Sequence, residues 1–251
     1  MYEVKIVKDL CYAPERLERN ALDLYLPQGE GPFPLLVFFY GGGLEQGVKE
    51  DLEGMGREFA QAGVAVAAPD YRLFPEAVYP DFLLDAARSV AWVNEHADAY
   101  LRRGKLFVGG YSAGCYLSMM LAFDKQYLGA HGLDPDAFGG FVQLSGQPTT
   151  HFNVLKYSGL DPRTARIDHR APLYFARSQG APQLFIVSDD DMPCRLEQNQ
   201  LFVKTLEHFE YAAPLRLQVV HGPGHGDFLN DAGRGHSYLF EQALPFLQEM
   251  A

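Results

Sequence analysis

The chain has 251 residues, of which 47% are hydrophobic, so it can bury a substantial core as one domain spanning residues 1–251. Its formal net charge of -11 argues against nucleic acid or an anionic membrane surface as a partner. Its three cysteines, Cys11, Cys115 and Cys194, are too few and too scattered for a disulfide framework or a zinc site, so a reducing, cytoplasmic setting is expected.

Targeting and membrane segments are not recognised. The first ten residues, MYEVKIVKDL, lack the apolar stretch of a signal peptide. No run approaches the roughly 18 apolar residues of a membrane span. We therefore expect no membrane partner, and no motif predicts a metal site or a cofactor.

The predicted elements alternate between strands and helices. Antiparallel edge strands are expected near residues 4–7 and 21–26. Buried strands are expected at 35–40, 64–71, 105–111, 138–146, 183–191 and 215–220, and helices at 52–61, 82–100, 113–124, 195–209 and 236–250. This order implies an α/β fold with about eight strands in a mostly parallel sheet and helices on both faces. Ligands bind beyond the carboxyl ends of such strands, so functional residues are expected just after them.

A run of three glycines follows the first buried strand, in the sequence VFFYGGGLEQG at residues 37–47. Three consecutive glycines cost backbone entropy, so they indicate either a tight turn or a close approach of the backbone to a ligand. The tyrosine before them, Tyr40, and the polar pair after them, Glu45 and Gln46, are unexpected at the end of a core strand.

The segment GYSAG, residues 110–114, lies between a predicted strand and a predicted helix. In that context a G-x-S-x-G pattern indicates a nucleophilic serine, because the sharp turn exposes its hydroxyl and needs glycines two residues away. The N-terminus of the helix would also favour a developing negative charge. An ordinary glycine-rich turn is the alternative interpretation of Ser112.

A serine nucleophile needs a histidine as general base, and eight histidines compete for that role. Placement after a strand favours His225, in the loop HGPGHGDF, with His221 second. An orienting acid is expected in SDDDMP, where Asp189, Asp190 and Asp191 follow a buried strand. At least one of the three aspartates must turn to solvent, since adjacent buried carboxylates are costly.

With these motifs in this order, the chain resembles the α/β-hydrolase superfamily, specifically the small carboxylesterases related to the hormone-sensitive-lipase group and to acetyl-esterase and arylformamidase-like proteins. The resemblance extends from residue 22 to the final helix. Its landmarks are YGGG at 40–43, DYRLFPE at 70–76, GYSAG at 110–114, DDDMP at 189–193 and GHGDF at 224–228.

The resemblance implies roles for individual residues. Ser112 would be the nucleophile, His225 the base and Asp191 the best match to the family acid, with Asp190 as the alternative. The backbone amides of Gly42, Gly43 and Ala113 would form the oxyanion hole. Tyr40 departs from the family, which has a histidine there. Its hydroxyl is expected to brace residues 41–47, which we call the glycine loop. The predicted substrate-binding residues are Tyr40, Leu44, Glu45, Tyr111, His151 and Phe152; for Glu45 and Gln46 a solvent-facing position in the loop is the alternative.

The resemblance further implies a serine carboxylesterase that hydrolyses small acetyl or short-chain esters through an acyl-enzyme. Residues 147–182 are the candidate lid, and so small a cover argues against a lipase at a lipid interface. An amide hydrolase such as an arylformamidase, a peptidase or an acyltransferase would use the same residues and stays open. A non-catalytic binder is disfavoured because every triad position is filled. A homodimer is an open expectation.

Overall fold

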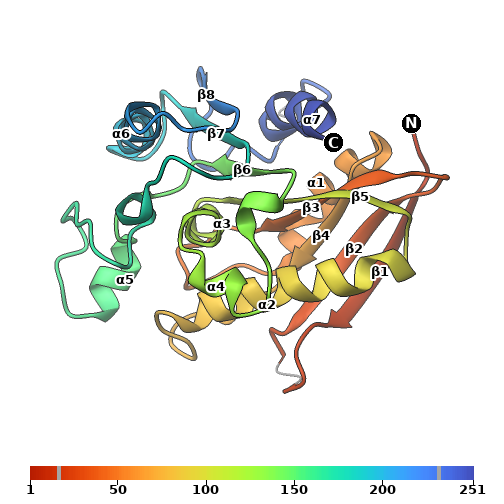
Figure 1. Cartoon of the computed structure of the whole chain (residues 1–251), viewed down its shortest axis with the longest axis horizontal. Coiled ribbons are helices and arrows are strands. Elements are labelled where there is room, and N and C mark those ends of the chain that lie inside the picture. The colour runs from red at the N-terminus through yellow and green to blue at the C-terminus, as the bar shows by residue number, and fades with distance from the viewer. Residues whose placement is uncertain (16–17, 231–232) are drawn as a thin grey trace.

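The computed structural model describes residues 1–15, 18–230 and 233–251 (Figure 1). Residues 16–17 and 231–232 fall inside the predicted domain and lie outside the described residues. Eight strands form one sheet in the order β1-β2-β4-β3-β5-β6-β7-β8. The strands are β1 (Val4–Cys11), β2 (Ala21–Pro27), β3 (Phe33–Phe39), β4 (Ala65–Pro69), β5 (Arg103–Tyr111), β6 (Gly140–Leu144), β7 (Gln183–Ser188) and β8 (Leu215–Val220).

The sheet is mostly parallel, as the alternating pattern predicts. β1 pairs with β2, and β2 with β4, in antiparallel register, whereas all pairs from β4 to β8 are parallel. Strands such as β4, with the sequence AVAAP, are buried along their whole length because helices cover the central strands. The predicted α/β-hydrolase fold is confirmed.

Helices cover both faces of the sheet (Figure 1). The longer helices are α1 (Glu53–Gln61), α2 (Asp81–His96), α3 (Ala113–Phe123), α6 (Arg195–His208) and α7 (Tyr238–Met250). α1 contacts α7, where the rings of Phe59 and Phe240 pack edge to face, and α2 contacts α3. None of the described helices is long and apolar enough to cross a bilayer.

Three boundary predictions are corrected by the structure. The helix predicted at 82–100 ends at His96 and continues as the 3₁₀ turn Ala97–Ala99. The strands predicted at 138–146 and 183–191 end at Leu144 and Ser188. Each of these two strands ends within one residue of its last ladder hydrogen bond, donated by the N–H of Ser145 and of Asp189.

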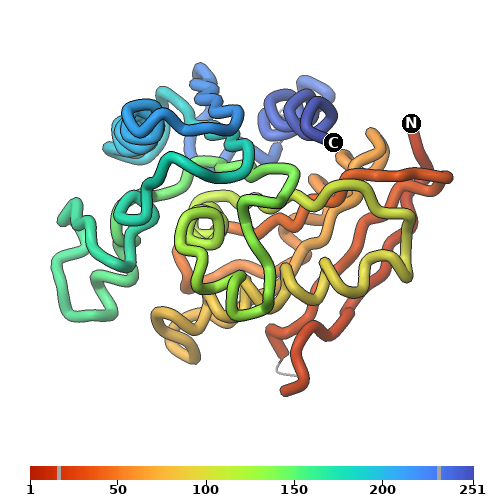
Figure 2. Tube along the Cα trace, in the orientation of Figure 1, coloured from red at the N-terminus to blue at the C-terminus, as the bar shows by residue number. Residues whose placement is uncertain are grey.

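The segment 147–182 follows β6 and contains α5 (Phe152–Tyr157) and the 3₁₀ turn Pro172–Phe175. Figure 2 shows it as the green-to-teal stretch of the tube on the left of the view. It is anchored internally by Asp168, whose carboxylate accepts hydrogen bonds from Arg166, Arg170 and Thr150. These bonds, of which the bond to Arg170 is the strongest influence, lower the pKa of Asp168.

Candidate active site

Five loops meet at the carboxyl edge of the parallel strands. They follow β3, β5, β6, β7 and β8, which are consecutive in the sheet although they are far apart in the chain. Hydrogen bonds continue the ladder into three of these loops, from Ser112 N–H to the Leu144 carbonyl, from Ser145 N–H to the Ile186 carbonyl and from Asp189 N–H to the Val220 carbonyl. The parallel sheet therefore brings side chains from distant segments to one place.

Ser112 occupies a sharp turn between β5 and α3. Its φ of 55° lies in the left-handed region, which non-glycine residues rarely adopt. A Cβ atom at Gly110 or Gly114 would lie 2.3 or 2.2 Å from backbone atoms, so only glycine fits on either side. Ser112 is 9% exposed and directly precedes the first residue of α3. The turn thus presents the hydroxyl next to the N-terminus of the helix.

His225 lies in the loop after β8 and reaches back over the sheet. Its Nε2 is 2.9 Å from Ser112 Oγ, and its Nδ1 is 2.6 Å from Asp191 Oδ1. Tyr111 fixes the backbone of this loop, because its hydroxyl donates a hydrogen bond to the His225 carbonyl. The imidazole is thereby held with one nitrogen toward the serine and the other toward the carboxylate.

Asp191 lies three residues after the end of β7, and its side chain is 1% exposed. Burial acts to raise the pKa of Asp191, but hydrogen bonds from His225 and Ser145 oppose it and the pKa ends below its ordinary value. The backbone N–H of Met192 also donates to Asp191 Oδ1, at 2.7 Å. Asp191 is therefore a carboxylate that stays ionised inside the site.

The alternative residues are placed elsewhere. His221 pairs with Asp189 at 2.6 Å, and the His221 side chain is 83% exposed. Asp190 is exposed as well, and its N–H donates to Ser188 Oγ. Of the three aspartates, the structure brings Asp191 to His225 and leaves the other two at the surface.

Ser145 is a residue of this site that the sequence patterns did not single out. Its Oγ donates to Asp191 Oδ2 at 2.6 Å and lies 3.0 Å from His225 Nδ1. Its φ of 51° is again left-handed, and the residue is fully buried. Its position directly after β6 is the signal that could have found it.

Two serines thus contact His225, and their surroundings separate their roles. The Ser145 hydroxyl lies on the Nδ1 side of the imidazole, donates a hydrogen bond to the Asp191 carboxylate and has no exposed surface. The Ser112 hydroxyl contacts Nε2, keeps some exposure and borders the glycine loop, since a Cβ at Gly41 would lie 3.2 Å from Ser112 Cβ. The geometry therefore places the Ser112 hydroxyl at Nε2, on the open side of the imidazole, and the Ser145 hydroxyl at Nδ1, on the enclosed side.

Replacing Ser145 with alanine is expected to lower kcat for a small ester by about tenfold. The change removes a hydrogen bond to an ionised group, which is typically worth about 1.5–3 kcal/mol. It leaves Asp191 Oδ2 without the donor that lowers the pKa of Asp191, so that pKa rises and the acid limb of the kcat/KM pH profile moves to higher pH. The measurement is a pH–rate profile with p-nitrophenyl acetate.

Ser188→Ala is the matched control for this variant. Ser188 is a buried serine at the end of the neighbouring strand β7, and its hydroxyl accepts from the amide of Asp190 rather than contacting Asp191. We expect an unchanged acid limb in Ser188→Ala. A Ser145→Ala profile that overlays the unmodified enzyme would show that the Ser145–Asp191 bond has no influence on the base.

The glycine loop after β3 presents unpaired backbone amides beside Ser112. Among the described residues, the N–H groups of Gly42, Gly43 and Ala113 donate to no other protein group. Gly42 has a φ of 107° and a Cβ there would lie 2.1 Å from the Gln46 carbonyl oxygen, so the turn requires glycine. The carbonyl of Gly43 accepts a hydrogen bond from Asn153 Nδ2 in α5 at 2.5 Å, which holds the loop from the other side.

Tyr40 is buried under the glycine loop. Its ring stacks on Tyr71 at 4.5 Å and lies against Gly47, where a Cβ would be 2.5 Å from the ring. Its hydroxyl accepts from Arg19 Nη1 at 3.3 Å and donates to the Tyr71 carbonyl at 3.4 Å. Both hydrogen bonds are long, but the same Arg19 Nη1 also donates to the Gly47 carbonyl at 2.9 Å, so the ring contacts the loop directly and the hydroxyl is linked to it through Arg19.

The remaining predicted pocket residues divide by burial. Leu44 is fully buried and its carbonyl accepts from the N–H of Phe74, so it anchors the loop in the core. Glu45 is exposed and pairs with Lys156 of α5 at 2.8 Å. His151 is 1% exposed and caps α5 by accepting from Asn153 N–H. Burial, followed by the charge of Arg195, lowers the pKa of His151 to about 3.

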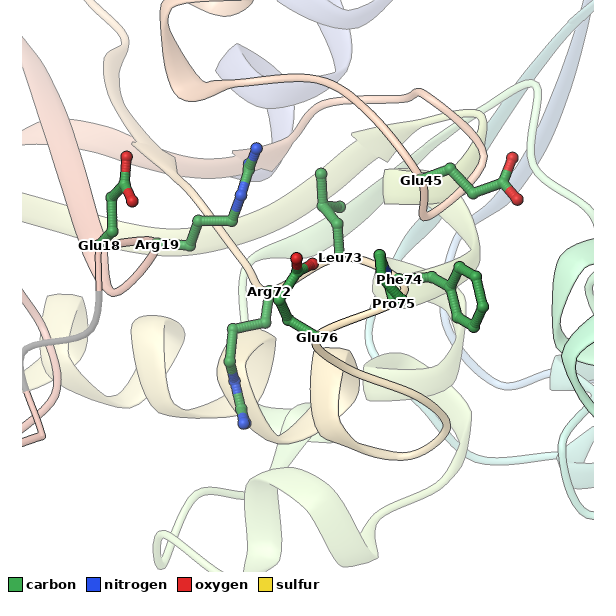
Figure 3. Close-up of a pocket in the computed structure, with 8 residues that line it drawn as sticks. All are labelled: Glu18, Arg19, Glu45, Arg72, Leu73, Phe74, Pro75 and Glu76. Atoms are coloured by element: carbon green, nitrogen blue, oxygen red, sulfur yellow. The ribbon is translucent and has the colours of Figure 1, made fainter.

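Phe152 and Tyr111 do line cavities near Ser112. Tyr111 lines a cavity of about 380 Å³ together with Tyr40, Gly41, Gly42, Gln46, Gly47, Asp51, Leu52 and Leu229. Phe152 lines another of about 520 Å³, formed with Gln147, residues 162–165, residues 192–195 and Gln198. A third pocket, of about 510 Å³, is lined in part by Glu45 of the glycine loop, and Figure 3 shows Glu45 and Phe74 opposite Glu18 and Arg19.

Two family models match this chain. The model of the prolyl oligopeptidase family matches residues 80–251, which include Ser112, Asp191 and His225. The BD-FAE model matches residues 22–135, which include the glycine loop and Ser112. The two matches overlap and together extend from β2 to the end of the chain.

Curated relatives are named as esterases. The carboxylic ester hydrolase LipN of Mycobacterium tuberculosis is 31% identical over 227 residues, covering 79% of this chain and 59% of its own. The probable isoprenylcysteine alpha-carbonyl methylesterase ICME of rice, Oryza sativa, is 32% identical over 116 residues, covering 45% of this chain and 28% of its own. The chain thus spans less than two thirds of the length of these relatives.

Solved structures share the fold at low sequence identity. A truncated carbohydrate esterase from gut microbiota superposes with a TM-score of 0.81 at 18% identity, covering 99% of this chain and 96% of that one. The esterase Est2 of Thermogutta terrifontis superposes with a TM-score of 0.74 at 21% identity, covering 100% of this chain and 92% of that one.

Proposed function

Since this chain belongs to the prolyl oligopeptidase family, an α/β-hydrolase family, we propose that it is a serine carboxylesterase acting on small esters. The observation that carries the proposal is the hydrogen-bonded series from Ser112 Oγ to His225 Nε2 and from His225 Nδ1 to Asp191. Names of relatives such as LipN support ester rather than other substrates.

In the proposed mechanism, Ser112 Oγ attacks the ester carbonyl while His225 Nε2 takes the hydroxyl proton. Asp191 holds the imidazole in the tautomer that keeps Nε2 free to accept, and it stabilises the imidazolium that forms. The free amides of Gly42, Gly43 and Ala113 would donate to the oxyanion, and each such donor typically contributes about 10²- to 10³-fold in rate.

The second half of the cycle returns the proton. The imidazolium gives it to the departing alcohol, which leaves an acyl group on Ser112. Water then attacks this acyl-enzyme with His225 again as base, and the acid product leaves. The proposal includes no cofactor and no metal, because these residues supply the nucleophile, the base and the oxyanion donors.

A small acyl group is part of the proposal. The segment 147–182 is the cover we assign to the site, and two of its contacts reach the glycine loop: Asn153 to the Gly43 carbonyl and Lys156 to Glu45. A short cover that is tied down in this way favours short substrates over long acyl chains. A reducing, cytoplasmic setting is also proposed, supported by three cysteines that are all free.

A panel of p-nitrophenyl acetate, butyrate and octanoate tests the substrate class. We expect the highest kcat/KM for acetate or butyrate. The kcat/KM for octanoate should be at least about tenfold lower, because the part of the acyl chain that extends beyond the cavity would make no apolar contacts. Mass spectrometry after a fluorophosphonate probe should find one adduct, on Ser112. A folded protein that is not labelled would favour a non-catalytic binder.

Amide hydrolysis is the second candidate, because the matching family model is named for a peptidase and the same three residues cleave amides. N-formylkynurenine and a prolyl p-nitroanilide belong in the same panel. If either amide has a higher kcat/KM than every ester, the ester assignment is wrong while the assignment of Ser112, His225 and Asp191 stands.

A further inference from the structure

The cavity of about 520 Å³ beside the site contains a buried cation. We call it the arginine cavity; its lining consists of Gln147, Phe152, Pro162, Arg163, Thr164, Ala165, Met192, Pro193, Cys194, Arg195 and Gln198. It borders the site on two sides. Met192 donates its N–H to Asp191, and Phe152 lies 3.8 Å from the position of a Cβ on Gly43.

Arg195, the first residue of α6, is 5% exposed. Its guanidinium carries five N–H donors, and among the described residues its one hydrogen bond is from Nη2 to Met192 Sδ, at 3.7 Å. A thioether sulfur is a weak acceptor. No nitrogen of Arg195 is among the fully enclosed unpaired atoms, so the unpaired donors keep contact with solvent, and the cavity that Arg195 lines provides it.

The neighbouring acid cannot serve as the partner of this cation. Asp191 is the carboxylate whose charge acts on Arg195. However, its Oδ1 already accepts from His225 and Met192 N–H, and its Oδ2 accepts from Ser145. Burial lowers the pKa of Arg195, but a guanidinium remains charged in proteins. A buried charge without a partner is costly, and such groups are normally paired.

The sign of the charge in the arginine cavity is unusual for this protein. The chain as a whole carries -11, yet among the residues that the structure describes the cavity is lined by two arginines and by no aspartate or glutamate. The pocket in Figure 3 differs, since three glutamates accompany its two arginines. Arg163 is already paired with Asp161 and its side chain is 88% exposed, which leaves Arg195 as the buried cation facing the cavity.

We propose that the arginine cavity binds a carboxylate carried by the ester substrate, with the guanidinium of Arg195 as its partner. A planar guanidinium matches the two oxygens of a carboxylate. This inference rests on the proposed esterase function and narrows it to esters that bear a second, anionic group on either the acyl or the alcohol side.

Matched pairs of esters test the proposal. On the alcohol side, 4-acetoxybenzoate is compared with the neutral 4-acetoxybenzamide; on the acyl side, p-nitrophenyl hydrogen glutarate is compared with p-nitrophenyl pentanoate. We expect the anionic member of at least one pair to have a kcat/KM at least about tenfold higher. Arg195→Met, which removes the charge at similar volume, should lower that ratio by about ten- to a hundredfold.

Two further variants separate binding from folding. Arg163→Gln removes the other arginine of the arginine cavity, and it should change the ratio by less than about threefold because Arg163 is exposed and paired. Arg195→Lys keeps the charge without the planar fork and should retain part of the preference. It also provides the test if Arg195→Met does not fold.

Titration of 4-hydroxybenzoate and of glutarate separates this inference from the esterase proposal. We expect the preferred anion to bind the unmodified protein at least about tenfold more tightly than Arg195→Met. The inference would be overturned if the unmodified protein and Arg195→Met had the same ratio of kcat/KM between anionic and neutral esters and bound the anions equally well. If neutral esters were still cleaved, the esterase function would stand. Anion binding that depends on Arg195 without any ester turnover would overturn the esterase function instead.

Discussion

Replacing Ser112 with alanine is expected to reduce kcat for p-nitrophenyl acetate by about 10⁵- to 10⁶-fold, the scale of loss when a serine nucleophile is removed. The fold should remain intact, because alanine differs from serine by one oxygen. The partner that loses its hydrogen bond is His225 Nε2, and the His225 side chain is 22% exposed, so water can replace the hydroxyl. The measurement is a steady-state assay of the variant with its far-UV circular dichroism as a control for folding.

Ser145→Ala provides the contrast that makes the Ser112 result specific. Both serines contact His225, but Ser112 lies at Nε2 and Ser145 at Nδ1. We expect a fluorophosphonate probe to label Ser112 in the Ser145→Ala variant. The Ser112→Ala variant should not be labelled at all. If Ser112→Ala retained more than about 1% of the activity, the nucleophile would have to be assigned to another residue.

Replacing Asp191 with asparagine is expected to lower kcat by about 10⁴-fold, because an amide holds the imidazole in the wrong tautomer and cannot stabilise the imidazolium. The side chains have nearly the same shape, and asparagine Nδ2 would face His225 Nδ1. The effect should be larger than that of Ser145→Ala, which removes one donor to the carboxylate and leaves its charge. A steady-state assay at pH 7–8 measures it.

Asp189→Asn and Asp190→Asn are the matched controls, since all three aspartates are consecutive. Asp189 pairs with the exposed His221, and Asp190 faces solvent. Neither substitution should change kcat by more than about threefold. A loss of 10⁴-fold in Asp190→Asn rather than Asp191→Asn would assign the acid to its neighbour and contradict the geometry.

Much of the fold follows from local pattern. The alternation of buried apolar runs with amphipathic stretches is strong enough that strands such as β8, at Leu215–Val220, have the bounds that the sequence predicts. The helix α5, Phe152–Tyr157, was missed because it is six residues long. Its stability comes from the His151 cap and from its contacts with the glycine loop, and neither can be seen in the periodicity of so short a segment.

Within the site, residues that belong to a sequence motif could be predicted, whereas residues without a motif could not. Ser112 and the glycine loop carry local constraints, a left-handed φ and Cβ collisions, that leave glycines in the sequence. Ser145 also has a left-handed φ, but it belongs to no motif, because small polar residues after buried strands look alike in the sequence. Leu44 was predicted to bind substrate, yet it is fully buried, since the turn after the glycines directs it into the core.

The sequence by itself determined the order of elements, the mostly parallel sheet and the serine turn, because each depends on residues that are close together in the chain. The tertiary structure decided which of three adjacent aspartates meets the imidazole, since one position along the loop after β7 separates a buried carboxylate from an exposed one. It also decided that Arg195 is a buried cation beside the site. The burial and the pairing of Arg195 depend on residues that are about 30 to 50 positions away in the chain, such as Gln147 and Pro162. Only folding brings these residues together.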